Sequence, residues 1–470
     1  MTHPTLFDSI VSQMVWPALP APGPANRLAV LFQLEQTQWW SPEALRDAQF
    51  EQLKKLVPYA VRQVPHYAKA LAAWASPDAV TPVSWSQIPC VTRTALAPGS
   101  KLLHSQQVPK DHGAVHSDST SGSTGHQTEF RATDLTSFFW KVFALRDHVW
   151  HRRDFRQKMM AIRYVKDDPE RAKRGVTTPE WGFATDGVVK TGPAVAYDLR
   201  ANISFLAERL LAEKPGYLLS HASMLGGLID HCERHGVRPE GLLELRSFGE
   251  MVPDDLAERS LRLWGAPLVD TYSCQEAGLL ATQCPDQPQN LHVMSENVLL
   301  EVIDEQGRAC QPGEVGRVLI TSLHNFASPL IRYELSDYAR LGPPCPCGRG
   351  LPVLERVMGR YRNLVTLPNG DTRWPRIGWE EMVTIVPQVD GIQLVQHTLE
   401  DIEARLVLRE AMTPEQQAAL IAFVQRNLGH PFRVRIERVE SIRHEVNGKV
   451  ESFISRLPKP RPPAQDQPRG

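Results

Sequence analysis

The chain has 470 residues with 42% apolar and 22% charged side chains, and its formal net charge is -1. This length exceeds one compact core, so we expect two or more domains in an ordinary globular protein. The charge balance gives no electrostatic reason to expect a nucleic acid or an anionic membrane as a partner. No apolar run approaches about 18 residues and no secretory signal pattern is present, while the seven cysteines favour reduced thiols or metal ligands. We therefore expect a cytoplasmic protein without a membrane span.

The N-terminal part predicts an irregular arm followed by helices. Residues 1–26 carry prolines at positions 17, 20, 22 and 24, which argue against a packed helix there. Ser41-Pro42-Glu43 is a helix start with an N-cap serine and a proline in the first turn, and leucines and valines continue at helical spacing to about Leu71. Helical spacing returns at Phe138–Leu145.

Between these helical stretches lies a run of small residues, Thr120-Ser121-Gly122-Ser123-Thr124-Gly125. It has almost no apolar surface to bury, but it offers backbone N–H groups, hydroxyl donors and glycines that tolerate positive φ. These groups suit a phosphate, and a helix that follows such a loop places its N-terminus near that phosphate. A Ser/Gly linker is the alternative. No lysine follows the last glycine, which argues against a P-loop NTPase.

From Gln157 onward, strand-like and helical segments alternate, which indicates an α/β domain with a largely parallel sheet. Ligands of such sheets bind at the carboxyl ends of the strands. Strands are expected at 158–162, at 216–219, ending at 247–249, and at 267–272, with helices at 202–212, 223–235 and 253–264.

Residues 298–321 change to two antiparallel strands around a turn at 304–307, so we expect a β-subdomain at about 292–357. The last hundred residues predict a small α+β unit with strands at 392–395, 404–408 and 432–436 and a tight hairpin at 367–371. Thr413-Pro414-Glu415-Gln416 is a capping box that opens a helix to about Leu428. The predicted layout is an irregular arm at 1–26, a large domain at 27–360, a small mobile lid at 361–457 and a disordered tail at 458–470.

Four further stretches carry groups that suit a nucleotide. The ring of Tyr272 can stack on a purine, and the carboxylate of Glu276 can hold a magnesium ion near phosphates. Asp337 could accept both ribose hydroxyls, Gly359-Arg360 could form a hinge, and a turn presents Lys449. The alternatives are a structural strand end for Tyr272 and a solvated turn residue for Lys449.

The order and spacing of these stretches resemble the adenylate-forming superfamily of acyl-CoA synthetases, specifically its phenylacetate–CoA ligase-like branch, which includes relatives of coenzyme F390 synthetases. The resemblance runs from about Trp39 to Leu457. It implies a large adenylation domain, a mobile C-terminal domain, ATP and Mg2+ as cofactors and coenzyme A as acceptor. It gives catalytic roles to Lys449 and to Glu276, which would hold Mg2+. The ATP-binding set that the resemblance implies is Ser121, Gly122, Ser123, Thr124, Gly125, Gly249, Glu250, Tyr272, Ser273, Asp337 and Arg360.

The chain departs from the family pattern at three points, the first of which is Ser273-Cys274-Gln275, where the family more often has Gly-x-Thr. His126-Gln127 follow Gly125 where the family usually has Lys or Arg and then Pro, so the loop carries one formal positive charge fewer. Tyr361-Arg362-Asn363 follow the hinge where the branch usually has acidic residues.

A possible metal site lies outside these motifs. Cys345 and Cys347 form a C-x-C knuckle, and Cys284 is followed by His292 eight positions later. Three thiolates and one imidazole would complete a tetrahedral structural zinc site, while free thiols in a proline-rich loop are the alternative. The resembling branch has similar Cys…Leu-His and Cys-x-Cys-Gly elements, so we predict structural Zn2+. The cysteines expected to be ordinary thiols are Cys90, Cys232, Cys274 and Cys310.

The resemblance implies ATP-dependent activation of a carboxylic acid to an acyl-adenylate, with pyrophosphate release, followed by transfer to coenzyme A. Transfer to an amine, a hydroxyl or a carrier protein is the alternative among enzymes, and a non-catalytic nucleotide-binding protein is the alternative outside them. The sequence does not name the acid, and it leaves a homodimer open. Aromatic residues could line a pocket for an aromatic or aryl-acetic acid, or could be core. These residues are Phe138, Phe139, Trp140, Trp181 and Phe183.

Overall fold

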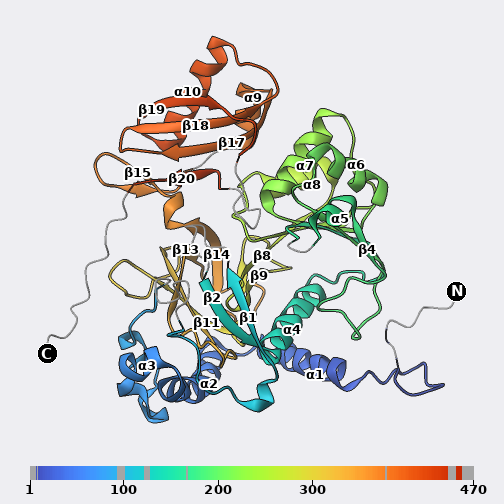
Figure 1. Cartoon of the computed structure of the whole chain (residues 1–470), viewed down its shortest axis with the longest axis vertical. Coiled ribbons are helices and arrows are strands. Elements are labelled where there is room, and N and C mark those ends of the chain that lie inside the picture. The colour runs from blue at the N-terminus through green and yellow to red at the C-terminus, as the bar shows by residue number, and fades with distance from the viewer. Residues whose placement is uncertain are drawn as a thin grey trace.

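The computed structural model describes residues 7, 9–92, 101–120, 128–165, 168–375, 378–442 and 451–457. A main body (residues 9–360) is built on a 12-stranded sheet, and a C-terminal unit (residues 361–457) contains a 4-stranded sheet. Figure 1 shows the C-terminal unit, in orange and red, above the main body and next to the green helices α6, α7 and α8. The architecture is the predicted α/β fold with a smaller α+β region.

The N-terminal helices are α1 (Pro22–Thr37), α2 (Pro42–Gln63) and α3 (Pro65–Ala70). The Ser41 side chain accepts a hydrogen bond from the Ala44 backbone N–H, which confirms the predicted N-cap. The prediction that residues 1–26 are all irregular is wrong at its end, because a proline in the first turn needs no N–H partner and α1 begins at Pro22. The short helices that follow are η1 (Ala72–Trp74), η2 (Pro77–Ala79), η3 (Trp85–Gln87) and η5 (Lys110–His112).

An antiparallel hairpin of β1 (Val115–Thr120) and β2 (Thr128–Thr133) precedes α4 (Asp134–Trp150). The loop between these strands, which contains Ser121–Gly125, lies outside the described residues. We expected this loop to lead into the helix, but β2 separates them, and α4 instead begins at a capping box formed by Thr133 and Thr136.

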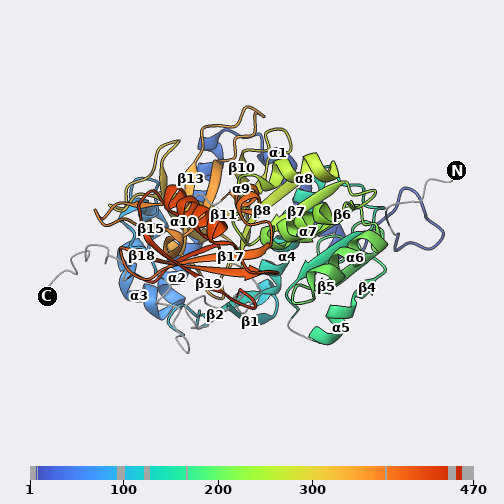
Figure 2. The same ribbon diagram turned by 90° about the horizontal axis from the view of Figure 1, so that it is seen from above.

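The parallel half of the 12-stranded sheet consists of β3 (Met159–Arg163), β5 (Ala194–Asp198), β6 (Tyr217–Ser220), β7 (Glu244–Phe248) and β8 (Leu268–Cys274), with β4 (Val176–Thr178) antiparallel at its edge. The helices α6 (Ile203–Glu213), α7 (Ala222–Arg234) and α8 (Leu256–Trp264) share one apolar core with these strands, and α5 (Pro169–Arg174) lies nearby. Seen from above in Figure 2, this half occupies one side of the molecule and α2 and α3 occupy the other.

The antiparallel half contains β9 (Gly278–Gln283), β10 (Leu291–Val293), β11 (Val298–Ile303), β12 (Val315–Ser322), β13 (Tyr333–Leu341) and β14 (Val353–Arg360). The predicted antiparallel pairing of the strands around residues 298–321 is confirmed. The β-subdomain expected at 292–357 does not have a sheet of its own, because β9 pairs with β8 and with β10 and thus joins both halves.

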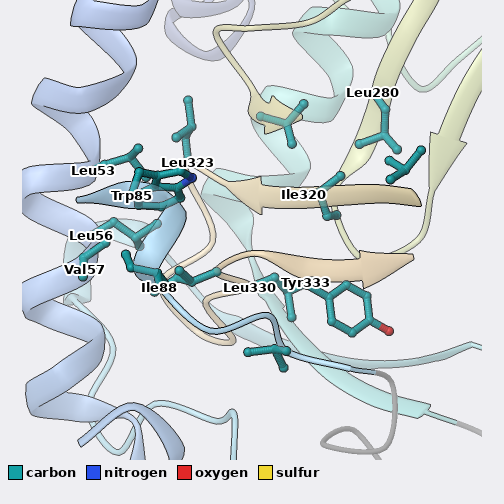
Figure 3. Packing of buried hydrophobic residues seen from close by; sticks show 14 of the residues in the cluster. Leu53, Leu56, Val57, Trp85, Ile88, Leu280, Ile320, Leu323, Leu330 and Tyr333 are labelled. Carbon is teal, nitrogen blue, oxygen red and sulfur yellow. The ribbon is translucent and has the colours of Figure 1, made fainter. Parts of the chain in front are cut away.

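The largest core cluster lies between α2 and this antiparallel half. Figure 3 shows Leu53, Leu56 and Val57 of α2 packed towards Ile320 of β12 and Tyr333 of β13. All five side chains are at most 1% exposed. Each buried aliphatic side chain contributes about 1.5–3 kcal/mol, so this cluster fixes the N-terminal helices against the strands.

The C-terminal unit is an α+β element with a core of its own. Its sheet orders β19 (Arg433–Arg438), β18 (Asp401–Leu408), β17 (Val389–Gln396) and β20 (Phe453–Ser455), packed against α9 (Trp379–Ile385) and α10 (Pro414–Leu428). The predicted capping box is confirmed, since the Thr413 and Gln416 side chains bond reciprocally at the start of α10. The predicted hairpin is formed by β15 (Val365–Thr366) and β16 (Thr372–Arg373), and η6 (Tyr361–Asn363) connects the unit to the main body. None of the helices that the structure describes is long and apolar enough to cross a membrane.

Candidate active site

A pocket lies where the ends of β7 and β8 meet β13, β14 and the C-terminal unit. It lies beyond the carboxyl end of β7, where ligands of such sheets bind. Six residues predicted to bind a nucleotide line this pocket, although they are far apart in the sequence. They are Gly249, Glu250, Tyr272, Ser273, Asp337 and Arg360.

Tyr272, Asp337 and Arg360 form a connected polar group in this pocket. The Tyr272 hydroxyl donates to Oδ2 of Asp337 at 2.8 Å. Arg360 stands opposite Asp337 in the β13–β14 pairing, with its Nε 3.8 Å from Oδ1. Burial and the Asp337 carboxylate raise the pKa of Tyr272 well above its usual range, so its hydroxyl remains a neutral donor. This group offers an aromatic ring beside a fixed carboxylate, which suits a nucleoside.

Gly249 and Glu250 follow β7 and turn the chain towards α7. Gly249 has φ of +75°, a conformation that glycine adopts without strain. The Glu250 carboxylate accepts a hydrogen bond of 2.9 Å from the backbone N–H of Ser223, in the first turn of α7. This contact fixes the loop that forms one wall of the pocket.

Asp270 is a pocket residue that the sequence reasoning missed. The Ser247 hydroxyl donates to its carboxylate, and burial raises the pKa of Asp270 to about 6. The available signal was an acid in an otherwise apolar strand, Leu268-Val269-Asp270. A buried acid with a raised pKa in a pocket is typical of a functional site.

Glu276 lies in the turn between β8 and β9, beyond the residues that line the pocket. Gly278 follows with φ of +73°, and a Cβ atom there would lie 3.1 Å from the Trp140 indole. The turn that carries Glu276 is therefore packed closely against α4. A half-buried carboxylate at this turn is a suitable oxygen ligand for Mg2+.

Lys449 and the predicted phosphate loop, Ser121, Gly122, Ser123, Thr124 and Gly125, lie outside the described residues. Glu451, the next described residue, follows Lys449 by two positions and lines the pocket. The Glu451 carboxylate pairs with Arg362 at 2.6 Å, and its backbone C=O accepts from the Gln393 side chain at 3.0 Å. Asn363 donates to the C=O of Phe453 at 2.7 Å, so the end of η6 and the start of β20 are tied together.

Arg332, which directly precedes β13, has a structural role in this chain. Its side chain is only 4% exposed and pairs with Glu301 at 3.1 Å. It also donates to the backbone C=O groups of Ser86 and Ile88, and its φ is +47°. These contacts hold the segment before residue 93 against β13, away from the pocket.

The four predicted metal ligands are gathered at the opposite end of β9. The ligand atoms of Cys284, His292, Cys345 and Cys347 all lie within 4.8 Å of one another. The Cys284 and Cys345 sulfurs are 3.9 Å apart, and the Cys347 sulfur is 3.3 Å from Nε2 of His292. Two sulfurs bound to a tetrahedral zinc lie about 3.8 Å apart, and a sulfur and an imidazole nitrogen about 3.5 Å. The donor set and spacing therefore fit a zinc ion.

The surroundings of this cluster support a charged metal site. Burial lowers the pKa of His292 to about 4, which leaves the imidazole neutral, as a ligand must be. The pKa of Cys347 lies below its usual value although burial acts to raise it, because Arg349 donates hydrogen bonds to the sulfur. The Asn290 side chain donates to the Cys345 sulfur at 3.2 Å. Such outer contacts orient the ligands.

The aromatic candidates separate into two groups. Trp181 donates to the C=O of Gln157 at 2.8 Å and packs on Tyr217 with ring centroids 5.3 Å apart, so it is a structural residue. Trp140 and Phe183 meet edge to face beside the β8–β9 turn, and Phe183 is 49% exposed. Their position beside the turn that carries Glu276 makes them candidates for contact with a substrate.

Sequence comparison finds relatives over most of the chain. A phenylacetate–coenzyme A ligase from Aromatoleum evansii is 24% identical over 446 residues, which cover 91% of this chain and 98% of that protein. The phenylacetate–coenzyme A ligase of Thermus thermophilus is also 24% identical, covering 78% and 82% of the two chains. No family model matches the sequence.

Structural comparison finds the same fold. A 2-hydroxyisobutyryl-CoA ligase in its postadenylation state gives a TM-score of 0.66 at 18% identity, over 87% of this chain and 89% of that chain. The same ligase in its thioesterification state, with acyl-adenylate and CoA, gives 0.58 at 19% identity, with the same coverage. An anthranilate–CoA ligase in complex with anthranoyl-AMP gives 0.51 at 15% identity over 71% and 65% of the two chains.

These likenesses agree with the residues gathered around the pocket, and they extend over nearly the whole chain. The chain is thus similar to phenylacetate–coenzyme A ligases over most of its length, and it has the fold of these CoA ligases.

Proposed function

We propose that this chain uses ATP to convert a carboxylic acid, of the aromatic or aryl-acetic class, to an acyl-adenylate and then transfers the acyl group to coenzyme A. One observation carries the proposal. A single pocket gathers six predicted nucleotide-binding residues from the main body together with Glu451, two residues after Lys449. The curated relatives that match most of the chain are phenylacetate–coenzyme A ligases, which supports the same reaction class.

The chemistry has two displacements. In the first, a carboxylate oxygen attacks the α-phosphorus of ATP, a P–O bond forms, and the bond to pyrophosphate breaks. In the second, the thiolate of coenzyme A attacks the acyl carbon, a C–S bond forms, and AMP leaves. The first transition state gathers negative charge on the α-phosphate, so it requires fixed donors and cations around it.

The roles we propose follow from the positions of the residues. Tyr272 stacks on adenine. Asp337, oriented by Tyr272 and Arg360, accepts hydrogen bonds from the ribose hydroxyls. Gly249, Glu250 and Ser273 form the pocket wall around the nucleotide. These contacts position the α-phosphate for attack.

The remaining roles concern charge. Residues 121–125 donate to the β- and γ-phosphates, and Glu276 holds Mg2+, which when bound neutralises phosphate charge. Lys449 stabilises the charge that develops on the α-phosphate. Because Lys449 belongs to the C-terminal unit, that unit acts as a mobile lid that completes the site when it closes.

We further propose that Cys284, His292, Cys345 and Cys347 hold a structural Zn2+. The fit of their spacing to a tetrahedral ion supports this role. Four protein ligands leave no position for a substrate. The ion would therefore join the end of β9 and the start of β10 to the β13–β14 loop.

The reaction is tested by incubating the protein with ATP, Mg2+ and a panel of aryl, aryl-acetic and short aliphatic acids. We expect acid-dependent pyrophosphate release, and a thioester when coenzyme A is added. Hydroxylamine traps an acyl-adenylate as a hydroxamate. Hydroxamate without thioester would indicate that the acyl acceptor is an amine, a hydroxyl or a carrier protein instead of coenzyme A. If no acid causes pyrophosphate release, the adenylation proposal fails and a non-catalytic nucleotide-binding protein is favoured.

The role of Lys449 is tested with Lys449→Ala. We expect adenylate formation to fall by at least about hundredfold, as for loss of a group that stabilises transition-state charge. Lys173→Ala is the matched control, because Lys173 is a surface residue that pairs only with Glu170 on its own helix in the described contacts. Parental adenylation by Lys449→Ala would contradict the assignment.

A further inference from the structure

A second contact between the C-terminal unit and the main body lies away from the pocket. Arg234, the last residue of α7, places Nη1 2.9 Å from Oδ1 of Asp390, the second residue of β17. The two side chains are 32% and 34% exposed, so solvent screens the pair only in part. Arg409 of the C-terminal unit binds the same carboxylate. Asp390 thus lies between an arginine of its own unit and an arginine of the main body.

The same face of α7 meets the C-terminal unit one turn earlier. Asp230 and Arg234 are four residues apart and so lie on one face of the helix. Burial raises the pKa of Asp230, while Arg259 and the indole of Trp379 act in the opposite direction. Trp379 begins α9 of the C-terminal unit, so α7 is close to that unit through two residues on one face.

β17 connects this contact to the pocket. Asp390 stands near the start of the strand, and Leu394 at its other half pairs in parallel with Phe453 of β20. The Leu394 N–H also donates to the C=O of Ser452 at 2.8 Å, and Ser452 lines the pocket beside Glu451. A paired strand transmits displacement along its length. The position of Asp390 is therefore linked through β17 to the positions of Ser452 and Glu451 at the pocket.

We propose that Arg234 and Asp390 are positioning residues that hold the C-terminal unit over the pocket and keep Glu451 and Ser452 at the pocket wall during adenylate formation. The inference rests on the proposed function and adds a docking contact to it. Neither residue lines the pocket. The pair acts through β17 and β20, which hold Ser452 and Phe453 at the pocket.

The docking contact is tested with Arg234→Ala, Arg234→Glu and Arg234→Lys. Removal of the charge is expected to slow adenylate formation about fivefold, near the upper end for a partly exposed ion pair. Arg234→Glu places a carboxylate against Asp390 and should slow adenylate formation about tenfold or more. Arg234→Lys retains the positive charge, and its rate should stay within about twofold of the parent. Asp390→Ala added to Arg234→Ala causes little further loss, since the shared contact is already gone.

The second half-reaction separates positioning from general damage. Thioester formation from preformed acyl-adenylate involves no pentavalent phosphate, so Arg234→Glu leaves its rate unchanged or raises it. Lys214→Glu is the matched control, because Lys214 forms an exposed pair with Glu240 within the main body, at 2.8 Å. It keeps the parental rates in both half-reactions.

A readout without substrate keeps the two proposals distinct. Trypsin cleavage after Arg360 or Arg362 reports how well the hinge segment is protected, and Arg234→Glu exposes it about fivefold more than the parent or Lys214→Glu. If the parent releases no pyrophosphate with any acid, the proposed reaction fails while this comparison still tests docking. Parental adenylation and protection in Arg234→Glu, or equal losses in both half-reactions with a lowered melting temperature, would overturn the inference.

Discussion

Replacing Tyr272 by phenylalanine separates two tasks of that residue. The ring remains for the proposed stacking on adenine, and only the hydroxyl that donates to Oδ2 of Asp337 at 2.8 Å is removed. Because burial and Asp337 raise the pKa of Tyr272 well above its usual range, the hydroxyl is a neutral donor at every working pH. The substitution thus removes one hydrogen bond and changes no charge.

The size of the effect depends on how the energy of the Tyr272–Asp337 hydrogen bond is divided between folding and ATP binding. The folded chain already contains the bond, so most of its energy contributes to folding, and Tyr272→Phe should lose about 1.5 kcal/mol of unfolding free energy. In the variant, Asp337 keeps its contact with Arg360 at 3.8 Å but is no longer held by Tyr272. ATP binding is therefore weakened only by the free energy needed to order the Asp337 carboxylate. Ordering one side chain costs about 1 kcal/mol, so the KM for ATP should rise about fivefold. The kcat stays within about twofold because the hydroxyl does not contact the reacting phosphate.

The assay is pyrophosphate release over a range of ATP concentrations, together with urea unfolding. Tyr197→Phe is the matched control, because the Tyr197 hydroxyl is 3.0 Å from a Glu213 oxygen in an equally buried site far from the pocket. It should lose similar stability and leave the KM for ATP unchanged. An unchanged KM in both Tyr272→Phe and Tyr272→Ala would refute the placement of the nucleoside.

Three further predictions address the rest of the chain. Cys347→Ser should reduce the zinc content measured by metal mass spectrometry and lower the melting temperature, whereas Cys90→Ser should keep the metal; equal zinc in both would exclude the predicted site. The pKa of Asp270 rises from 3.8 to about 6 on folding, so stability should fall by about 3 kcal/mol as pH rises from about 4 to 6. Asp270→Asn should abolish this dependence of stability on pH, measured by urea unfolding. A dependence that persists in the variant would show that another group causes it. Thr413→Ala should destabilise the C-terminal unit by about 1 kcal/mol through loss of the α10 cap, with the exposed Gln417→Ala as a near-neutral control; equal unfolding curves would contradict this.

Local chemistry made several elements predictable from the sequence. The caps at Ser41 and Thr413 depend on hydrogen bonds within three residues, and both are confirmed. The pocket residues Tyr272, Asp337 and Arg360 were identified through the order of motifs, and the structure brings them into contact across β8, β13 and β14. The assignments of Lys449 and of residues 121–125 stay predictions.

Non-local pairing explains what the sequence reasoning missed. The short strand β10 joins β9 to β14, a contact that no local pattern indicates, and it merges the expected β-subdomain with the parallel sheet. Asp390 has no motif around it, and its relation to Arg234 exists only because two separate units meet. Residues 128–133 alternate weakly and were not recognised as the strand that separates the phosphate loop from α4.

With the proposed zinc ion bound, β9 would link metal binding to the register of the sheet. Its six residues span about 20 Å, with the turn that carries Glu276 before one end and Cys284 directly after the other. A slip of one residue would turn every side chain of β9 to the opposite face and would move that turn relative to Trp140. An ion held by Cys284 and three ligands from other segments would forbid this slip. Chain that folds without zinc would then lack this restraint on the register of β9.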